Sequence, residues 1–116
     1  GNKFVEQVIT FGDNRKYITA LIVPSFENLI RKMKSLGLEE SDPKLLLKDA
    51  RVMDLFEKEI EAAQETLAPF EKIVKFTLLT EPFSIENKGL TSTLKIRRKV
   101  IREQYREEIE KMYSRA

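Results

Sequence analysis

The 116-residue sequence contains no cysteine and no histidine. Without cysteine there are no disulfide bonds, thiol nucleophiles or cysteine-based metal sites, and a reducing, cytoplasmic location is expected. Without histidine there are no catalytic triads built on imidazole and almost no zinc sites. Any catalysis must therefore use lysine, arginine, carboxylates, hydroxyls or backbone amides, and we expect no metal site.

The chain also lacks a long hydrophobic segment and a strong charge imbalance. Its longest apolar run, residues 19–23, is far shorter than a membrane span, and its first residues do not resemble a signal peptide. Hydrophobic residues make up 41% and charged residues 34%, which is typical of one globular domain. The formal net charge is only +2, so any affinity for anions must come from a local feature.

The hydrophobic pattern predicts an α+β fold, with a small sheet of about three strands packed against helices. β-branched and aromatic residues fill segments 4–11 and 17–23, and the turn-forming residues 12–15 separate them. These segments predict an N-terminal β-hairpin whose second strand is buried on both faces. Alternating polar and apolar residues over 74–78 predict a later, third strand.

Helical spacing of apolar residues predicts the remaining elements. Between the second and third strands we expect three helices, over residues 25–37 with Ser25 as N-cap, 43–47 and 52–67. A long amphipathic helix is expected to end the chain, with apolar residues at Ile101, Tyr105, Ile109 and Met112. Tyr105 and Tyr113 are expected to bury their rings and leave their hydroxyls in water.

A basic run over residues 87–102 is the most informative stretch, because it contains six cations and no carboxylate. The cations are Lys88, Lys95, Arg97, Arg98, Lys99 and Arg102. The predicted terminal helix begins within this run, where each exposed cation opposes the helix dipole by about 0.3–1 kcal/mol. Glu107, Glu108 and Glu110 lie in its last turns, where negative charge is also unfavourable. Because these charges are unfavourable for the helix, they indicate that this stretch of the chain binds an anion.

The residues alone leave four interpretations of the basic run open: a plain charged surface, a nucleic-acid face, a membrane-surface helix, or one lysine presented from a loop. A nucleic-acid face is disfavoured because no aromatic residue lies between Ser84 and Gln104 to stack on a base. A membrane-surface helix is disfavoured because the far half of the helix is acidic. Lys95 suits the last interpretation, since it follows a Thr-Ser-Thr loop, residues 91–93, that can bond its own backbone.

Three segments of the chain resemble the C-terminal domain of long-chain fatty acyl-CoA synthetases, which belong to the superfamily of AMP-forming adenylating enzymes. Residues 4–24 resemble the first hairpin of that domain, and residues 70–73 and 76–85 resemble the entry to its last strand. Residues 90–98 resemble the long-chain form of the C-terminal lysine motif, P-K-T-x-S-G-K-[IL]-x-R in the wider superfamily. This chain has Thr93-Leu94 in place of Ser-Gly, and Lys95 falls on the catalytic lysine.

The resemblance implies that residues 1–116 form the mobile lid domain of a longer enzyme, whose large N-terminal adenylation domain and hinge lie outside this sequence. Such enzymes use ATP and Mg²⁺ to convert a fatty acid into an acyl-adenylate, and then transfer the acyl group to CoA. Lys95 would be the catalytic residue of the first step, and an opposite face would serve the second. Thr93, Arg97 and Arg98 would support the loop or lie near the phosphates of CoA.

Further expectations follow from the resemblance. The 116 residues alone should be inactive and hold no cofactor, and their partners should be their own N-terminal domain with fatty acid, ATP and CoA as substrates. We expect no nucleic-acid partner, and any membrane association of the longer protein should not involve these residues. Two alternatives stay open: a stand-alone basic module that binds RNA or an acidic protein, and a non-catalytic scaffold.

Overall fold

The structure, a computed structural model, describes residues 2–114; residues 1, 115 and 116 of the predicted domain lie outside this part. Its elements, in chain order, are β1 (Val5–Phe11), β2 (Ile18–Pro24), α1 (Phe26–Ser35), α2 (Pro43–Leu46), α3 (Ala50–Ala63), the 3₁₀ turn η1 (Pro69–Glu71), β3 (Ile73–Leu78), α4 (Arg98–Gln104) and α5 (Arg106–Tyr113). The predicted α+β class with a three-stranded sheet is confirmed.

β2 is the central strand of the sheet, whose order is β1-β2-β3. β1 pairs with it antiparallel through the hairpin, and β3 pairs with it parallel. A parallel neighbour requires a long crossover connection, which here consists of α1, α2 and α3. The continuous apolar run of β2 follows from its position, because Ala20, Leu21, Ile22 and Val23 are all buried.

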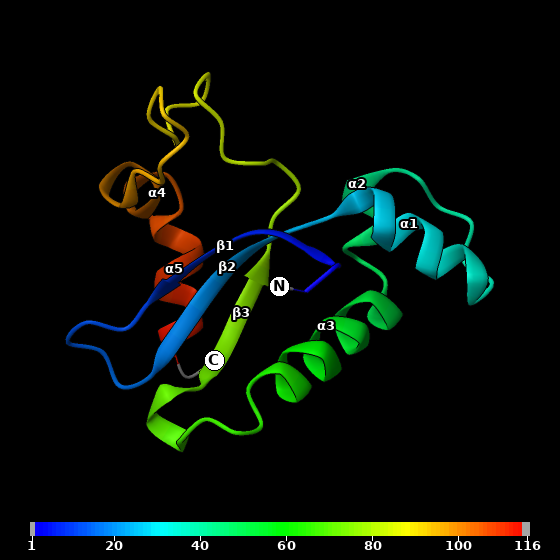
Figure 1. Cartoon of the computed structure of the whole chain (residues 1–116), viewed down its shortest axis with the longest axis horizontal. Coiled ribbons are helices and arrows are strands. Elements are labelled where there is room, and N and C mark those ends of the chain that lie inside the picture. Colours follow the sequence, from blue (N-terminus) through cyan, green and yellow to red (C-terminus); the bar gives the residue numbers. More distant parts are fainter. Residues whose placement is uncertain (1, 115–116) are drawn as a thin grey trace.

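Helices cover both faces of the sheet, as Figure 1 shows with α4 and α5 on one side and α1, α2 and α3 on the other. Alternate residues of β2 therefore enter two separate hydrophobic clusters. Leu21 and Val23 pack with Ile101, Ile109 and Met112 of α4 and α5. The opposite cluster joins β2 to α1, α2 and α3, through Ala20, Ile22, Leu29, Met33, Leu46, Val52 and Phe56.

The predicted helix starts are correct at α2 and differ in detail elsewhere. The Asp42 carboxylate accepts a hydrogen bond from the Lys44 amide at 2.9 Å, with proline at the first helical position. Asp49 caps α3 in the same way, and hydrogen bonds from Arg51 lower the pKa of Asp49 to about 2. Ser25 occupies the N-cap position of α1, but its side chain makes no capping hydrogen bond.

The terminal helix is divided at Tyr105, where the backbone leaves helical geometry (φ −112°, ψ 26°). The ring of Tyr105 packs edge-on against Phe83, so the change of direction keeps both helices against the same face of the sheet. The division corrects the argument from charge placement. Glu107 and Glu108 lie in the first turn of α5, where they are favourable, whereas α4 begins with Arg98 and Lys99 and has no acidic residue in its first turn.

Candidate functional site

The predicted catalytic lysine lies in a closed loop, residues 90–97, which we call the lysine loop. Leu90 and Ile96 form an antiparallel bridge across its base. The Thr91 amide donates to the Lys95 carbonyl at 2.8 Å, and the Arg97 amide donates to the Gly89 carbonyl at 2.9 Å. Backbone hydrogen bonds thus fix both ends of the loop, just before α4 begins.

Threonine hydroxyls hold the inside of the lysine loop. The Lys95 amide donates to Oγ1 of Thr91 at 3.1 Å, and the hydroxyls of Thr91 and Thr93 lie 3.1 Å apart. The prediction that the Thr-Ser-Thr segment bonds its own backbone is therefore confirmed. The backbone on either side of Lys95 has little freedom to move independently of the loop.

Leu94 occupies the left-handed region of the backbone map, with φ 64°. Its amide donates to the Thr91 carbonyl at 2.8 Å, which closes a tight turn directly before Lys95. Left-handed backbone disfavours a residue with a β-carbon by about 1–2 kcal/mol, whereas glycine adopts it freely. The turn therefore keeps the geometry that glycine would allow at this place in the motif, although the residue is leucine.

A platform centred on Asn87 supports the lysine loop. The side-chain oxygen of Asn87 accepts from the amides of Ser84 and Gly89 at 2.9 and 3.0 Å, and its nitrogen donates to the Pro82 carbonyl at 2.8 Å. A side chain at buried Gly89 would approach Asn87 and Phe83 to 3.1 Å, so the platform requires a small residue there. We call this arrangement the Asn87 platform.

Two glutamines join the Asn87 platform to the rest of the fold. The side chain of Gln7 in β1 accepts from the Phe83 amide at 2.7 Å and donates to the Phe83 carbonyl at 3.0 Å. The side chain of Gln104 in α4 donates to the Asn87 carbonyl at 2.8 Å. The lysine loop is therefore connected to both the sheet and α4, although it projects away from them (Figure 1).

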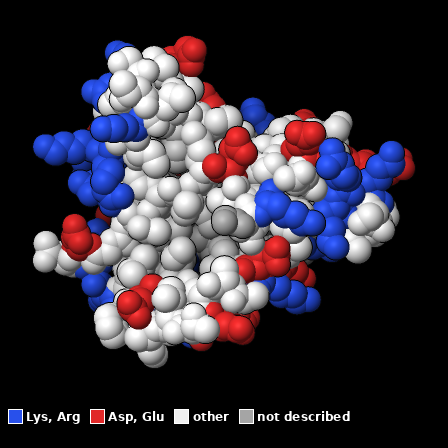
Figure 2. Space-filling model, viewed as in Figure 1, with Lys and Arg blue, Asp and Glu red and all other residues white. Residues whose placement is uncertain are grey.

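The Lys95 side chain is exposed, and no carboxylate of residues 2–114 lies within ion-pair distance of it. Basic side chains gather over α4, and a second basic group covers the end of α1 (Figure 2). An unpaired cation on a hydrogen-bonded loop contributes nothing visible to the fold. This geometry agrees with the interpretation of one lysine presented from a loop.

The structure separates the other predicted site residues into two groups. Thr93 and Arg97 belong to the lysine loop and are exposed. Arg98 instead turns toward β1, where its guanidinium donates to the Thr10 carbonyl at 2.6 Å and lies 5.2 Å from the centre of the Phe11 ring. Arg98 therefore has a packing role in this structure. Contacts of these three residues with a cofactor stay a prediction.

The sequence analysis missed a group of contacts that ties α5 to the hairpin, which we call the C-terminal clamp (Arg15, Tyr17, Thr19, Glu110 and Tyr113). The Arg15 guanidinium makes two hydrogen bonds to the Glu110 carboxylate, at 2.9 and 3.0 Å, and stacks 3.8 Å from the centre of the Tyr113 ring. These bonds raise the pKa of Arg15 and lower that of Glu110. Arg15 thus does more than form a turn.

The Tyr113 hydroxyl corrects a prediction, because it is not left in water. It donates to the Tyr17 carbonyl at 2.9 Å and accepts from the Thr19 hydroxyl at 3.1 Å. The rings of Tyr17 and Tyr113 stack with their centres 5.0 Å apart. No local sequence signal indicates this pairing, since its partners lie more than 90 positions apart.

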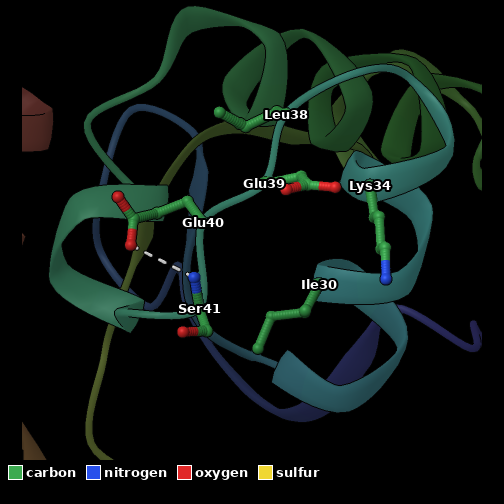
Figure 3. A pocket seen from close by; sticks show the side chains of 6 residues that line it. All are labelled: Ile30, Lys34, Leu38, Glu39, Glu40 and Ser41. Atoms are coloured by element: carbon green, nitrogen blue, oxygen red, sulfur yellow. Dashed lines mark hydrogen bonds between the residues drawn. The ribbon is translucent and has the colours of Figure 1, made fainter.

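A separate surface recess lies near the end of α1. The pocket in Figure 3 has a volume of about 290 Å³ and lies between the end of α1 and the loop before α2. It combines Lys34 with Glu39 and Glu40, and the Glu40 carboxylate accepts from the Ser41 amide at 3.1 Å. It lies far from the lysine loop (Figure 1). No helix among residues 2–114 has the length and apolar content needed to cross a bilayer.

Comparison with known families identifies the kind of domain that carries the lysine loop. A model of the AMP-binding enzyme C-terminal domain matches residues 1–116, the whole sequence. The chain belongs to this family. Within an AMP-binding enzyme C-terminal domain, the lysine loop and the Asn87 platform form the candidate site.

Curated relatives of this AMP-binding enzyme C-terminal domain include ligases of fatty acids. The chain is 31% identical over 112 residues to human long-chain-fatty-acid–CoA ligase 1. This alignment covers 95% of the chain and 16% of the ligase. It is 32% identical over 117 residues to long chain acyl-CoA synthetase 1 of Arabidopsis thaliana, covering 97% of this chain and 17% of that protein. The domain therefore spans about a sixth of the length of these relatives.

Solved structures with this fold include adenylation domains of carboxylate reductases. The adenylation domain from Mycobacterium chelonae has a TM-score of 0.67 and 25% identity, over 95% of this chain and 16% of that one. The adenylation and carrier didomain from Segniliparus rugosus, solved with AMP, has a TM-score of 0.64 and 28% identity, over 96% of this chain and 14% of that one. In all of these proteins, the matching part is a small share of a larger enzyme.

Proposed function

We propose that this domain is the mobile C-terminal domain of an ATP-dependent long-chain fatty acyl-CoA synthetase. Lys95 acts in the step that forms the acyl-adenylate, and another face of the domain serves thioester formation with CoA. The observation that carries this proposal is the exposed ammonium group of Lys95 on a hydrogen-bonded loop, with no ion-pair partner among residues 2–114. The human and Arabidopsis relatives, named for acyl-CoA synthesis, support the substrate class.

Adenylate formation brings two anions together, which explains the need for a fixed cation. A carboxylate oxygen of the fatty acid attacks the α-phosphorus of ATP, the bond from this phosphorus to the bridging oxygen breaks, and pyrophosphate leaves. An ammonium group held beside the reacting oxygens stabilises the charge that concentrates there in the transition state. Lysine supplies that charge as a compact point cation, and the loop does not have to reorganise during the reaction.

Thioester formation makes different demands on the domain. The thiol of CoA attacks the acyl carbon, the bond from this carbon to the AMP oxygen breaks, and the thiol loses its proton. No anion has to be joined to a second anion here, so Lys95 is not required beside the reacting atoms. Movement of the domain between the steps removes the lysine loop and admits CoA, while closure in the first step keeps water from the adenylate.

Among residues 2–114, no three histidine, cysteine, aspartate or glutamate side chains lie close enough together to hold a metal ion. Lys95 and Arg97, both exposed in the lysine loop, are the cations that we propose for contact with the phosphates of ATP or CoA.

Replacement of Lys95 in the full-length enzyme tests the proposal. With Lys95→Ala, we expect formation of the acyl-adenylate to slow about 10²–10³-fold, the usual loss when one preorganised electrostatic contact is removed. Thioester formation from supplied acyl-adenylate should proceed at the parental rate. Rapid-quench single-turnover assays with labelled fatty acid measure the two steps separately.

Lys48→Ala is the matched control, since Lys48 is also an exposed loop lysine but lies between α2 and α3, on the other side of the sheet. It should leave both steps unchanged. Acyl-adenylate formation at the parental rate in Lys95→Ala would refute the proposal. If both lysine variants slowed acyl-adenylate formation equally, the cause would be the net charge of the domain and not a specific contact of Lys95.

A further inference from the structure

The side chain of Leu94 has two properties that the folded domain does not need. It is 67% exposed, and its backbone is left-handed. Asn14 and Lys88 are the other non-glycine residues with positive φ in the part of the chain that the structure describes, and both are polar. Glycine at position 94 would relieve the backbone and remove the apolar group from water. Selection for folding alone would therefore favour glycine.

Packing within the domain does not explain the leucine. Leu94 belongs to neither hydrophobic cluster of residues 2–114. The neighbouring apolar residue Leu90 does pack against the cluster of α4 and α5, so the base of the lysine loop is anchored without Leu94. The exposed leucine next to the proposed catalytic residue therefore has no packing role in either cluster of the described residues.

We propose that Leu94 is an apolar anchor, which enters an apolar recess of the N-terminal adenylation domain when Lys95 reaches the acyl-adenylate site. This inference rests on the proposed function and adds the contact that determines how the lysine is placed. Two observations indicate that the partner of Leu94 is the N-terminal adenylation domain: the length of the relatives and the position of Leu94 in the sequence. The matching relatives carry more than four fifths of their chain outside this region, and Leu94 immediately precedes the residue that must meet that part.

The bonds of the lysine loop explain how such an anchor would position the ammonium group. Leu94 and Lys95 are both bonded to Thr91, the first through its carbonyl and the second through its hydroxyl. Fixing the Leu94 side chain in a recess therefore fixes the Lys95 backbone as well. Leu94 is a positioning residue, because it acts through Lys95 and not on the substrate.

Substitution of Leu94 separates its backbone effect from its side-chain effect. In the full-length enzyme, Leu94→Gly and Leu94→Asn suit the left-handed turn but lose the apolar group. We expect both to form acyl-adenylate at least about tenfold more slowly, from the lost burial of one leucine side chain. Leu94→Met keeps an apolar group and should stay within about twofold of the parent. Thioester formation from supplied acyl-adenylate should not change in any of the three.

The unfolding temperature should change in the opposite direction to the rate of adenylate formation. In the 116-residue chain, Leu94→Gly should unfold at the same temperature as the parent or higher, because the left-handed backbone is no longer unfavourable. A slower first step together with unimpaired stability cannot arise from a damaged fold. A clear loss of stability in Leu94→Gly would mean that leucine serves the domain itself, and would overturn the inference.

Lys95→Ala, assayed beside these variants, distinguishes failure of the inference from failure of the proposed function. If Lys95→Ala is slow in the first step while Leu94→Gly and Leu94→Asn match the parent, the anchor is wrong and the function stands. If Lys95→Ala matches the parent, the proposed function itself fails. Equal slowing by Leu94→Met and Leu94→Gly, or slowing of both half-reactions, would also overturn the anchor.

Discussion

The lysine loop and the C-terminal clamp are both built from many hydrogen bonds, yet they treat charge in opposite ways. In the clamp, Arg15 is paired with Glu110 and stacked on Tyr113. In the lysine loop, the backbone is satisfied while Lys95 has no carboxylate partner among residues 2–114. Charge in the clamp holds two elements together, whereas the charge of Lys95 joins no elements within residues 2–114.

The two regions also differ in what their hydrogen bonds support. Those of the clamp connect α5 to the hairpin and so close the fold around the sheet. Those of the Asn87 platform connect a projecting loop to the sheet and to α4. Substitutions in the platform should therefore impair the loop with little effect on the clamp, and the reverse should hold for the clamp.

Asn87→Ala should give the largest effect, because it removes three side-chain hydrogen bonds of the platform. At about 0.5–1.5 kcal/mol each, we expect a local loss of roughly 3 kcal/mol. Hydrogen exchange of the amides over residues 84–97 should become faster, while exchange in α5 stays slow. Asn87→Asp keeps the acceptor for the Ser84 and Gly89 amides and should show a smaller change. Equal acceleration in α5 would contradict the independence of the two regions.

Gln7→Ala should rank second, since it removes the two hydrogen bonds to the backbone of Phe83. We expect a loss of about 2 kcal/mol in the free energy of unfolding, measured by urea denaturation. Gln7→Glu keeps an acceptor for the Phe83 amide but no donor for its carbonyl, so it should fall between the parent and alanine. An alanine variant as stable as the parent would show that water replaces the glutamine.

Tyr113→Phe should rank third, because it keeps the stacked ring and removes only the hydroxyl. The Tyr17 carbonyl and the Thr19 hydroxyl each lose one partner. We expect the free energy of unfolding to fall by about 1 kcal/mol in the same urea experiment. Adenylate formation in the full-length enzyme should be unchanged, and a slower first step would link the clamp to the lysine loop.

Arg15→Gln should have the smallest effect, and the effect should depend on pH. The bond from Arg15 lowers the pKa of Glu110 below its ordinary value of 4.5, so the pair stabilises the fold above that pH. The contribution is lost as the pH falls through the lowered pKa. Thermal unfolding of parent and variant should therefore differ most near neutral pH and converge in acid. A constant difference across this range would assign the stabilisation to stacking on Tyr113.

Local patterns predicted much of this fold, because their causes are local. The hairpin turn at residues 12–15, the doubly buried β2 and the cap at Asp42 all depend on neighbouring residues. The parallel pairing of β3 with β2 was not predicted, since it depends on a crossover through three helices. The break at Tyr105 was missed because both halves keep the same apolar spacing across it.

The candidate site divides in a similar way. The Thr-Ser-Thr segment indicated a loop that bonds itself, and the motif indicated Lys95. The Asn87 platform was missed, because a single asparagine beside Lys88 and Gly89 is equally typical of a plain turn. Its attachment to Gln7 joins residues 76 positions apart, which no local pattern indicates.

The attachment of Asn87 to Gln104 has a consequence for the conformational entropy of the lysine loop. A free loop would have to search its conformations each time it met a substrate, and would lose that entropy in every cycle. Here the segment loses its backbone freedom once, when the polypeptide folds. The backbone of Lys95 is therefore already oriented relative to α4 before the domain meets any partner.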